Sequence, residues 1–359
     1  RGHIHGLLPG EQSRENRHYG GNCRARLILS KDGKTLRVLP ERYIPQQPFS
    51  FASGGCHAMK MHHFRNVVAV VERGSLRAAA RSLGLAQPVV SRSLKELEEE
   101  LGVTLFERGR LGMVPTKAGE LFVRRAKAIQ AEYQRTLDEL DQHRGVDKGS
   151  IVVACSGAAL MGLLPLTLDR FRRRFPGVRV KVIEGTYPML EADIRDGLID
   201  LYFGPVTKPQ QHTNMSIKPL MINRRIIVGR RGHPLQHATT LEELIDAEWL
   251  TTPVAENIDD EVLSVFKLAG LPSPNIVMQA TSSMSVTSIV SSSDLLAPLP
   301  EQWLGFINAT NLLSRIMVTG IPDAPPICSV YHTELPLTPA AQFLHDMAEQ
   351  AALDNHEKL

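Results

Sequence analysis

Between residues 61 and 102, apolar positions recur with the period of a helix and are interrupted by single glycines. The first run has the spacing i, i+3, i+4, i+7, which predicts one buried helix face: Phe64, Val67, Val68 and Val71. Gly74 ends this helix, and the Ser75 hydroxyl is suited to cap a second one that runs to about Leu83. Gly84 then supplies a turn, so the pattern predicts two short helices followed by a third.

The third predicted helix has two different faces. Pro88 fits its first turn, where a missing N–H costs little. One stripe is apolar and faces inward: Val90, Leu94, Leu97 and Leu101. The other is basic at its leading end and acidic later: Pro88, Ser91, Arg92, Lys95 and Glu99. A helix that enters a DNA major groove needs donors at its leading end and few carboxylates near phosphates. A solvated helix of a bundle is the alternative, and the preceding helix pair favours DNA.

Residues 103–122 predict two short strands around a basic turn, followed by a long helix. Arg108 and Arg110 could reach phosphate or a minor groove, or form a plain basic turn. Thr116 is suited to cap the helix, which runs to about Arg144. An apolar seam of alternating four- and three-residue steps predicts a partner helix, and hence a dimer: Phe122, Ala126, Ile129, Tyr133, Leu137 and Leu140. The segment GVDKGS reads as a hinge.

From Ile151 onward, buried strands alternate with helices, which predicts α/β units. Gly157 to Phe175 and Met189 to Gly197 are expected helices, and PPICSVYH leads to a last helix from Pro339 to about Ala352. About 70 residues precede Pro219 and roughly 100 follow it, so we expect two α/β subdomains, with the chain returning to the first at its end.

Several strands of this half end in small or hydroxyl residues where a helix begins. Helix N-termini carry unpaired N–H groups and positive dipole ends, so two of them facing each other would hold a carboxylate or sulfonate. These ends are expected on one rim between the subdomains: Ser156, Gly157, Gly204, Pro205, Thr252, Ser282 and Ser283. Simple helix capping is the alternative for each hydroxyl.

Charge is unevenly distributed along the 359 residues, whose net charge is +3. Residues 1–58 carry nine Lys and Arg against four Asp and Glu, residues 59–144 carry 15 against 11, and residues 145–359 carry 17 against 23. This asymmetry allows a nucleic-acid contact early in the chain and argues against one later. Four cysteines without CxxC spacing indicate reduced thiols, hence a cytoplasmic protein without a metal site.

The sequence favours neither an enzyme nor a membrane protein. It contains no GxSxG, HExxH or GxGxxG motif, and Ser264-x-x-Lys267 has no companion motif. No apolar run is long enough to span a membrane, and no secretory signal pattern is present. Residues 1–58 are polar, Gly-rich and begin without Met, so we expect a tag, translated upstream sequence or a disordered segment, apart from a small hairpin around Asp32-Gly33.

From about Met59 to its C-terminus, the chain resembles the LysR-type transcriptional regulators. The residues that carry the resemblance match the family pattern in order and spacing: Ser75, Ala78, Ala79, Leu83, Gln87, Pro88, Ser91, Leu97, Glu98, Leu101, Gly102, Leu105, Phe106, Arg108, Thr116, Ala118 and Gly119. The resemblance implies a multidomain α+β and α/β protein, with a winged helix-turn-helix, a long linker helix and a two-subdomain effector domain like periplasmic binding proteins.

The expected domains follow from these patterns together. They are an extra segment at 1–58, a winged helix-turn-helix at 59–116, a linker and dimerisation helix at 117–144, a hinge at 145–149 and an effector-binding domain at 150–359. Within the last, subdomain I is expected at 150–221 and 331–359, and subdomain II at 222–330.

The resemblance also implies roles for residues of this chain. Gln87, Pro88, Ser91, Arg92 and Lys95 would face the groove, Ser75 would hold a phosphate, and the wing with Arg108 and Arg110 would reach outward. The family usually has Ser or Thr where this chain has Ala86, which removes a cap of about 1 kcal/mol. Among the rim residues, the resemblance favours Ser156, Thr252 and Ser282 over Ser283 and Gly204.

The implied function is that of a regulator without a cofactor other than its effector. The segments SGAALMGLLPL and ELPLTPAAQFL are similar to the branch that regulates degradation of aromatic sulfonates and carboxylates, so the effector is expected to be a small organic acid. The implied partners are double-stranded promoter DNA, further copies in a homodimer or homotetramer, and RNA polymerase. A small-molecule binding protein without a sequence-specific DNA role is the alternative, and an architectural DNA-binding role stays open.

Overall fold

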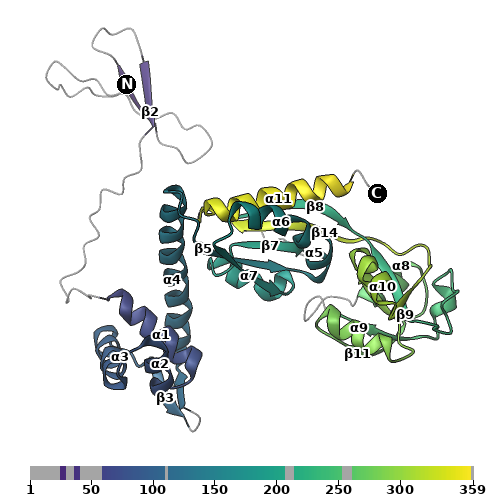
Figure 1. The fold of residues 1–359 in the computed structure, drawn as a ribbon, viewed down its shortest axis with the longest axis horizontal. Coiled ribbons are helices and arrows are strands. Elements are labelled where there is room, and N and C mark those ends of the chain that lie inside the picture. Colours follow the sequence, from purple (N-terminus) through teal and green to yellow (C-terminus); the bar gives the residue numbers. More distant parts are fainter. Residues whose placement is uncertain are drawn as a thin grey trace, which may run out of the picture. The chain divides into compact units, whose positions relative to one another are not determined.

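The computed structural model describes residues 25–29, 36–40, 59–109, 112–206, 214–252 and 261–356 (Figure 1). The chain divides into two units, residues 1–58 and 59–359. In the first unit, β1 (Ala25–Leu29) pairs antiparallel with β2 (Leu36–Pro40), with Leu27 opposite Val38. The expected turn at Asp32-Gly33 lies outside the described residues.

The second unit begins with three helices and a two-stranded wing. These are α1 (Met61–Arg73), α2 (Leu76–Leu83), α3 (Gln87–Leu101), β3 (Phe106–Gly109) and β4 (Gly112–Pro115). The Ser75 hydroxyl accepts a hydrogen bond from the backbone N–H of Ala78 at 3.2 Å, so the predicted cap of α2 is present. One core joins the three helices and the first wing strand: Val67, Val70, Ala79, Val90, Leu94, Leu97, Leu105 and Phe106.

The long helix α4 (Lys117–His143) starts inside this small domain. The Thr116 hydroxyl accepts from the N–H of Gly119 at 3.0 Å, and Val123 belongs to the same core as α1 to α3. Gly119 is required by close packing, because a Cβ placed there would lie 2.0 Å from the carbonyl oxygen of Leu105. The start of α4 is therefore part of the winged domain.

Subdomain I is built on a five-stranded sheet with the order β6-β5-β7-β14-β8. Its elements are β5 (Gly149–Cys155), α5 (Gly157–Gly162), α6 (Leu164–Arg174), β6 (Val178–Glu184), α7 (Tyr187–Arg195), β7 (Leu201–Pro205), β8 (Met215–Asn223), β14 (Ala324–His332) and α11 (Pro339–His356). One core lies between the sheet and α5, α6 and α11, and another lies under α7. The helix expected from Gly157 to Phe175 is two helices, which meet at Leu163 just before Pro165.

Subdomain II contains two smaller sheets, with the orders β12-β9-β13 and β10-β11. Its elements are β9 (Arg225–Arg230), η1 (Glu242–Leu244), β10 (Glu248–Thr251), α8 (Glu261–Leu268), β11 (Asn275–Gln279), α9 (Ser283–Ser291), β12 (Ala297–Pro300), η2 (Glu301–Trp303), α10 (Leu304–Thr310) and β13 (Leu313–Ile316). The N–H of Leu250 donates to the carbonyl of Leu296 at 2.8 Å, which joins the two sheets.

The expected limits of subdomain II are wrong by several residues. β14 pairs with β8 from Ala324, opposite Asn223, and with β7 from Ile327, so the chain has rejoined the first sheet well before residue 331. At the other crossing, β8 remains in the first sheet to Asn223, and β9 starts at Arg225. Subdomain II therefore runs from 224 to 323. Long-range strand pairing decided both limits, and apolar patterning alone cannot reveal it.

The two strands that connect the subdomains are tied to each other. The side-chain amide of Asn223, which is fully buried, donates to the carbonyl of Pro325 at 3.0 Å. Gln302 of η2 donates to the carbonyl of Ile222 at 3.1 Å. The first bond holds the outgoing and the returning strand side by side where they pass between the sheets, and the second ties η2 of subdomain II to the outgoing strand.

Polar contacts attach α4 to subdomain I along most of its length. Arg135 donates to the carbonyl of Gly197 at 2.6 Å, and Asp138 accepts from the N–H of Ser150 at 2.9 Å. Further contacts join Arg124 to Asp196 and Gln142 to the N–H of Ala340. At 100° per residue, Arg124, Arg135, Asp138 and Gln142 share one side of the helix. Within the described residues, no helix combines the length and the apolar character that a membrane span needs.

The packing at Gly119 can be tested with a matched pair of glycine substitutions. Gly119→Ala should lower the free energy of unfolding by about 1–3 kcal/mol, because the new methyl group overlaps the Leu105 carbonyl. Gly305→Ala, in α10, meets nothing within 4 Å and should stabilise the protein by about 0.5–1 kcal/mol. Urea unfolding followed by circular dichroism measures both. Equal effects of the two substitutions would contradict the close approach.

Candidate functional site

The outer face of α3 is an exposed polar surface in the winged domain. Gln87, Pro88, Arg92 and Lys95 are exposed, and Ser91 is half-buried. Six side chains of this face line one open groove: Pro88, Ser91, Arg92, Lys95, Glu96 and Glu99. The sequence-predicted residues of the third helix are thus brought together on one accessible surface.

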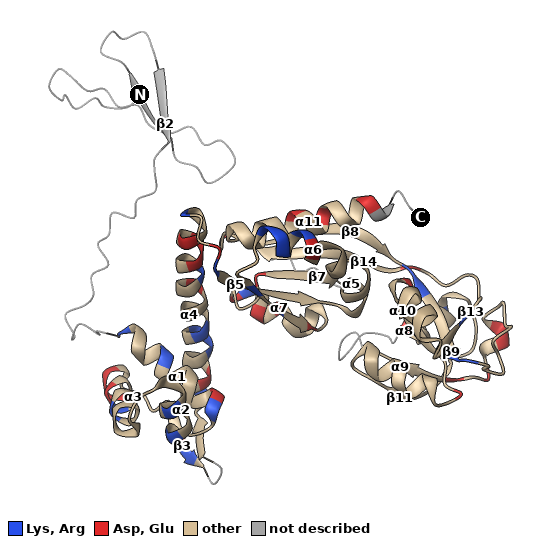
Figure 2. Ribbon diagram, in the orientation of Figure 1, with Lys and Arg blue, Asp and Glu red and all other residues tan. Residues whose placement is uncertain are grey.

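Charge changes sign along this face (Figure 2). The amino group of Lys95 lies 3.3 Å from a carboxylate oxygen of Glu99 one turn later, and both side chains are largely exposed. Arg92, one turn earlier, has no ion pair among the described residues. Of the two basic residues on this face, Arg92 is therefore the one without an ion-pair partner among the described residues, and it lies in the first half of α3.

The start of α3 has no side-chain cap, as expected, whereas Glu98 near its end makes hydrogen bonds that the sequence did not predict. Ala86 precedes the helix and provides no side-chain cap, as its methyl group requires. Glu98 accepts hydrogen bonds from the N–H groups of Leu105 at 2.7 Å and Phe106 at 3.0 Å, so it fixes the start of the wing against the helix. Local periodicity assigns no such role to Glu98, because its partners lie seven and eight residues further on.

The wing presents Arg108 to solvent on β3. It is anchored at its other strand, where the N–H of Met113 donates to the carbonyl of Gly74 at 3.1 Å. Gly112 adopts a φ of +129°, and a Cβ there would lie 2.3 Å from the same carbonyl, so this position needs glycine. Arg110 lies outside the described residues.

The apolar seam predicted on α4 is split between the core and the surface. Ile129, Tyr133, Leu137 and Leu140 are exposed by 42%, 53%, 40% and 56%. Phe122 is half-buried and stacks on Phe64, with ring centroids 5.6 Å apart. Ala126 is fully buried within the chain, so its place in an exposed seam is wrong: α1 packs on this part of α4.

At the rim between the subdomains, the first strand end is occupied by Ser156 and Gly157. The Ser156 hydroxyl accepts from the N–H of Ala159 at 3.3 Å, so it caps the short helix α5. Its own N–H donates to the carbonyl of Phe203 on β7 at 2.8 Å. Gly204 lies beside it, because a Cβ there would be 2.9 Å from the Cβ of Ser156. Pro205 follows as the last residue of β7.

Subdomain II supplies the facing side of the rim. Ser282 caps α9 by accepting from the N–H of Ser285 at 3.2 Å. Ser283 lies close to subdomain I, because a Cβ built on Gly157 would lie 2.4 Å from the Ser283 hydroxyl oxygen. Thr252 follows β10, whose last residue Thr251 accepts from the N–H of Ala280 at 2.9 Å. The predicted rim residues of the two subdomains therefore meet at Gly157 and Ser283.

Two polar residues of the rim were missed by the sequence reasoning. Glu184 ends β6, and its carboxylate oxygen lies 3.8 Å from the same Cβ position on Gly157. The Tyr202 hydroxyl donates to the carbonyl of Pro205 at 3.3 Å and lies 2.3 Å from a Cβ built on Gly204. The available signal was position, because each stands on a strand that ends at this rim.

Burial perturbs the tyrosines beneath the rim. Tyr187 and Tyr202 have ring centroids 5.8 Å apart and are 2% and 0% exposed. Burial raises the pKa of Tyr187 to about 12 and raises the pKa of Tyr202 further. Among the described residues, the Tyr187 hydroxyl has no hydrogen-bond partner. Burial also raises the pKa of the Cys155 thiol to about 12, so this thiol stays protonated and unreactive.

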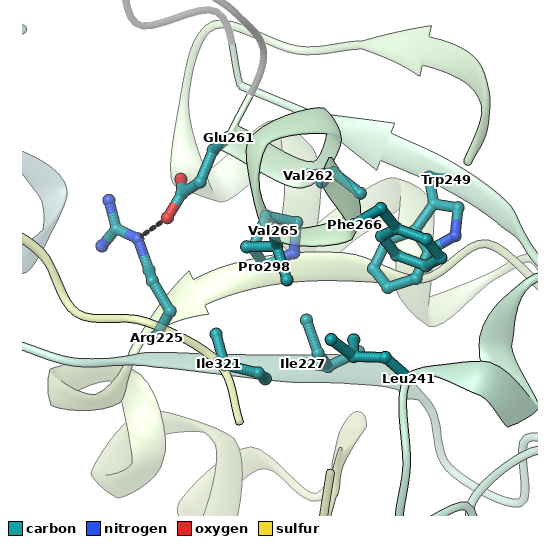
Figure 3. Close-up of a pocket in the computed structure, with 10 residues that line it drawn as sticks. All are labelled: Arg225, Ile227, Leu241, Trp249, Glu261, Val262, Val265, Phe266, Pro298 and Ile321. Atoms are coloured by element: carbon teal, nitrogen blue, oxygen red, sulfur yellow. Dashed lines mark hydrogen bonds and ion pairs between the residues drawn. The ribbon is translucent and has the colours of Figure 1, made fainter. Parts of the chain in front are cut away.

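A second cavity lies under α8 in subdomain II, away from the rim (Figure 3). Its walls are apolar except for the ion pair between Arg225 and Glu261. Its volume is about 10 Å³, room for about one water molecule, so it does not fit an organic effector. In the part of the chain that the structure describes, no group of His, Cys, Asp and Glu side chains could hold a metal ion.

Two family models match most of the chain. The family model "Bacterial regulatory helix-turn-helix protein, lysR family" matches residues 61–120, and "LysR substrate binding domain" matches residues 144–353. The chain belongs to the LysR family. LysR regulators are DNA-binding transcriptional regulators and not enzymes, and they respond to small-molecule effectors.

Individual LysR regulators are similar over most of the chain. The regulator GbpR of Azospirillum brasilense is 29% identical over 239 residues, which are 66% of this chain and 70% of GbpR. TdcA of Escherichia coli (strain K12) is 24% identical over 294 residues, 81% of this chain and 93% of TdcA. Their names support the family and leave the effector of the present LysR regulator open.

Solved structures confirm the expected fold. The crystal structure of CbnR, a LysR family regulator, covers 82% of this chain and 99% of its own, with a TM-score of 0.64 and 22% identity. CbnR has also been solved in complex with its target DNA. A full-length variant of OxyR from Pseudomonas aeruginosa covers 82% of this chain and 95% of its own, with a TM-score of 0.59 and 21% identity.

The unpartnered hydroxyl of Tyr187 leads to a prediction for stability. Tyr187→Phe should leave the free energy of unfolding at pH 7 unchanged or raise it by up to about 1 kcal/mol, because it removes a buried polar group without a partner. The folded-state pKa is raised, so stability present below pH 10 is lost as pH rises toward 12. The Tyr187→Phe variant should lose less of its free energy of unfolding between pH 10 and pH 12 than the unaltered protein. Urea midpoints at pH 7 and in alkaline buffer measure this, with Tyr331→Phe as control, and a loss above about 1 kcal/mol at pH 7 would contradict it.

Proposed function

We propose that this LysR regulator reads promoter DNA through the first half of α3. The observation that carries the proposal is the exposed outer face of α3, on which Arg92 makes no ion pair with a described residue. In a major groove, an arginine pairs with the O6 and N7 atoms of guanine, and a glutamine pairs with adenine. Arg92 and Gln87 are the residue types for these two pairings, while Pro88 offers apolar contact and Ser91 and Lys95 offer donors.

Phosphate contacts would place α3 in its groove. Ser75 stands at the start of α2, where backbone N–H groups and a hydroxyl are available to a phosphate. Arg108 on the exposed wing, with Arg110 beside it in the sequence, would contact the adjacent backbone or minor groove. LysR regulators bind promoter DNA and form oligomers, so two such surfaces would act together on two half-sites.

The exposed part of the α4 seam is the proposed dimer contact. Ile129, Tyr133, Leu137 and Leu140 share one side of the helix, roughly opposite the side that is attached to subdomain I. A run of four large apolar side chains on one exposed helical stripe is the pattern expected for packing on a second helix. A homodimer or homotetramer built on this stripe leaves the contacts of α4 with its own subdomain intact.

The effector is proposed to bind at the rim between the subdomains. Ser156, Gly157, Gly204 and Pro205 would contact it from subdomain I, and Thr252, Ser282 and Ser283 from subdomain II. The approach of Ser283 to Gly157 supports one site built by both halves. A carboxylate or sulfonate, carried by an aromatic or other small organic acid, would take the N–H groups of α9. Binding to one arrangement of the halves better than another would then alter how the dimers sit on DNA and contact RNA polymerase in the cytoplasm.

The proposed role of α3 predicts the effect of Arg92→Ala. It should weaken binding to the upstream intergenic DNA of its own gene by about 10- to 100-fold and relax specificity at one base pair. Fluorescence anisotropy at fixed salt, with scrambled DNA as competitor, measures both quantities. Arg170→Ala removes an exposed arginine of α6 and is the matched control, expected to bind like the unaltered protein.

Two outcomes of this DNA-binding experiment would contradict the proposal. If the unaltered protein binds its upstream DNA no better than scrambled DNA, a small-molecule binding or an architectural role replaces specific regulation. If specific binding is present but Arg92→Ala leaves it unchanged, α3 does not read the sequence through this residue.

The proposed dimer contact predicts the effect of charge on the seam. Leu137→Asp combined with Leu140→Asp should shift the protein toward monomer by at least tenfold in dissociation constant, because two charges would be buried between helices. Analytical ultracentrifugation over a concentration series measures the constant. Leu353→Asp, at a 62% exposed leucine of α11, is the control and should leave assembly unchanged. Dimers of unaltered affinity in the double variant would place the contact elsewhere.

A further inference from the structure

One buried hydrogen bond links α1 to the first half of α3. The side-chain amide of Asn66 in α1 donates to the Ser93 hydroxyl in α3 at 2.9 Å, across 27 positions of the chain. Asn66 is 1% exposed and Ser93 is 6% exposed, so solvent has little access to this bond. The residues that follow them, Val67 and Leu94, belong to the apolar core of the winged domain. Ser93 itself directly follows Arg92, the residue proposed to read DNA.

This hydrogen bond is present at a cost in stability. Among the described residues, the side-chain carbonyl oxygen of Asn66 is buried and has no hydrogen-bond partner. A buried acceptor of this kind loses its bonds to water on folding, which an apolar side chain would avoid. In some proteins a buried polar residue fixes the register of packed helices, whereas apolar contacts are non-directional. The pair is therefore better suited to orienting α3 than to stabilising the domain.

The two halves of α3 are held in different ways. The second half is tied to the wing by the Glu98 carboxylate, which accepts from two backbone N–H groups. The start of the helix has no side-chain cap, because Ala86 precedes it. Within the described part of the chain, the bond from Asn66 is the only side-chain hydrogen bond that links residues 87–94 to another element. The DNA-reading half is thus oriented by this bond and by apolar packing.

The helix that carries Asn66 is itself anchored on α4. Phe64 of α1 stacks on Phe122 of α4, and Val67 and Val123 belong to one core. Asn66 therefore offers its amide to α3 from a helix that is packed against the long helix. The hydrogen bond sets the direction of α3 relative to α1 and α4 together.

A small rotation of α3 would be enough to disturb the reading of bases. A helix with its side chains is about 10–12 Å across, so a turn of about 20° about its axis displaces the outer side-chain atoms by about 2 Å. Hydrogen bonds to base edges require donor–acceptor distances of about 2.7–3.2 Å. Such a turn would therefore remove a bidentate contact made by Arg92.

From these observations we infer that Asn66 is a positioning residue for sequence reading. Through Ser93 it sets the rotation of α3, and thereby the place of Arg92 against the base edges. The inference rests on the proposed reading of DNA by α3. Successive residues of a helix differ in direction by about 100°, so a bond at the buried Ser93 fixes the direction in which the exposed Arg92 points.

The test separates DNA specificity from stability with two variants. Ser93→Ala leaves the Asn66 amide without its partner and should lower the urea midpoint. Asn66→Leu combined with Ser93→Ala removes both polar groups, and leucine has the branching of asparagine. This double variant should return the urea midpoint to that of the unaltered protein or above it. A pair that only supports the fold would regain specificity together with stability, whereas a positioning pair would not.

Specificity is measured on the full-length protein by fluorescence anisotropy at fixed salt. The readout is the ratio of the dissociation constants for scrambled DNA and for the upstream intergenic DNA of its own gene. This ratio should fall about tenfold in Ser93→Ala and in the double variant. The dissociation constant for scrambled DNA should change by less than about twofold, because it depends on phosphate contacts.

Ser82→Ala is the matched control in the same small domain. The Ser82 hydroxyl donates to the carbonyl of Ala79 at 2.8 Å, within α2, so it links no two elements. Its removal should leave the specificity ratio unchanged.

The outcomes separate this inference from the proposed function. A double variant as specific as the unaltered protein would contradict the positioning role, and so would variants that lose affinity for scrambled and upstream DNA equally. If Arg92→Ala lowers the specificity ratio while both Ser93 variants keep it, α3 reads DNA and the role of Asn66 is wrong. If the unaltered protein does not prefer its upstream DNA, the proposed function and this inference fall together.

Discussion

The arrangement of the effector domain depends on the chain crossing twice between its two halves. The first sheet is complete only when β14 returns to lie between β7 and β8, so both connecting strands must pass through the same place. The buried amide of Asn223 fixes that place by bonding to the carbonyl of Pro325. With the halves joined there, the ends of β5, β6 and β7 are left facing α9, and Gly157 and Ser283 meet. The absence of a side chain at Gly157 lets the two subdomains approach so closely.

The outer face of α3 and the rim between the subdomains differ in charge. In the winged domain, acidic residues are kept to the second half of α3, and one of them, Glu98, has its carboxylate occupied by the first wing strand. Lys95 already has a carboxylate partner in Glu99, whereas Arg92 is left available. In the effector domain the available charge is negative instead, because the acidic Glu184 is the only charged residue of the described rim segments, residues 156–157, 184–187, 204–206, 251–252 and 280–284. The proposed DNA-binding face and the described rim segments thus differ in the sign of their available charge.

Local signals in the sequence were sufficient for the first domain. Ser75 and Thr116 cap their helices as expected, because a cap depends on a few neighbouring residues. The strand–helix alternation was likewise enough for the α/β class. Features decided by distant contacts were not accessible: the return of β14 at Ala324 depends on pairing across about 100 residues, and Ala126 is buried because α1 covers it. Glu184 was missed because the rim was searched for hydroxyl and small residues that donate to an anion, and the carboxylate that ends β6 is neither.

The attachment of α4 also has a mechanical consequence. Asp138 lies 22 positions after Thr116, about 33 Å along the helix, with the start in the winged core and Arg124, Arg135 and Asp138 bonded to subdomain I. Because these contacts hold α4 along its length, the helix would turn together with subdomain I. A rotation of the two by about 10° about Asp138 would displace the start of α4 by about 6 Å, nearly two base-pair steps of about 3.4 Å.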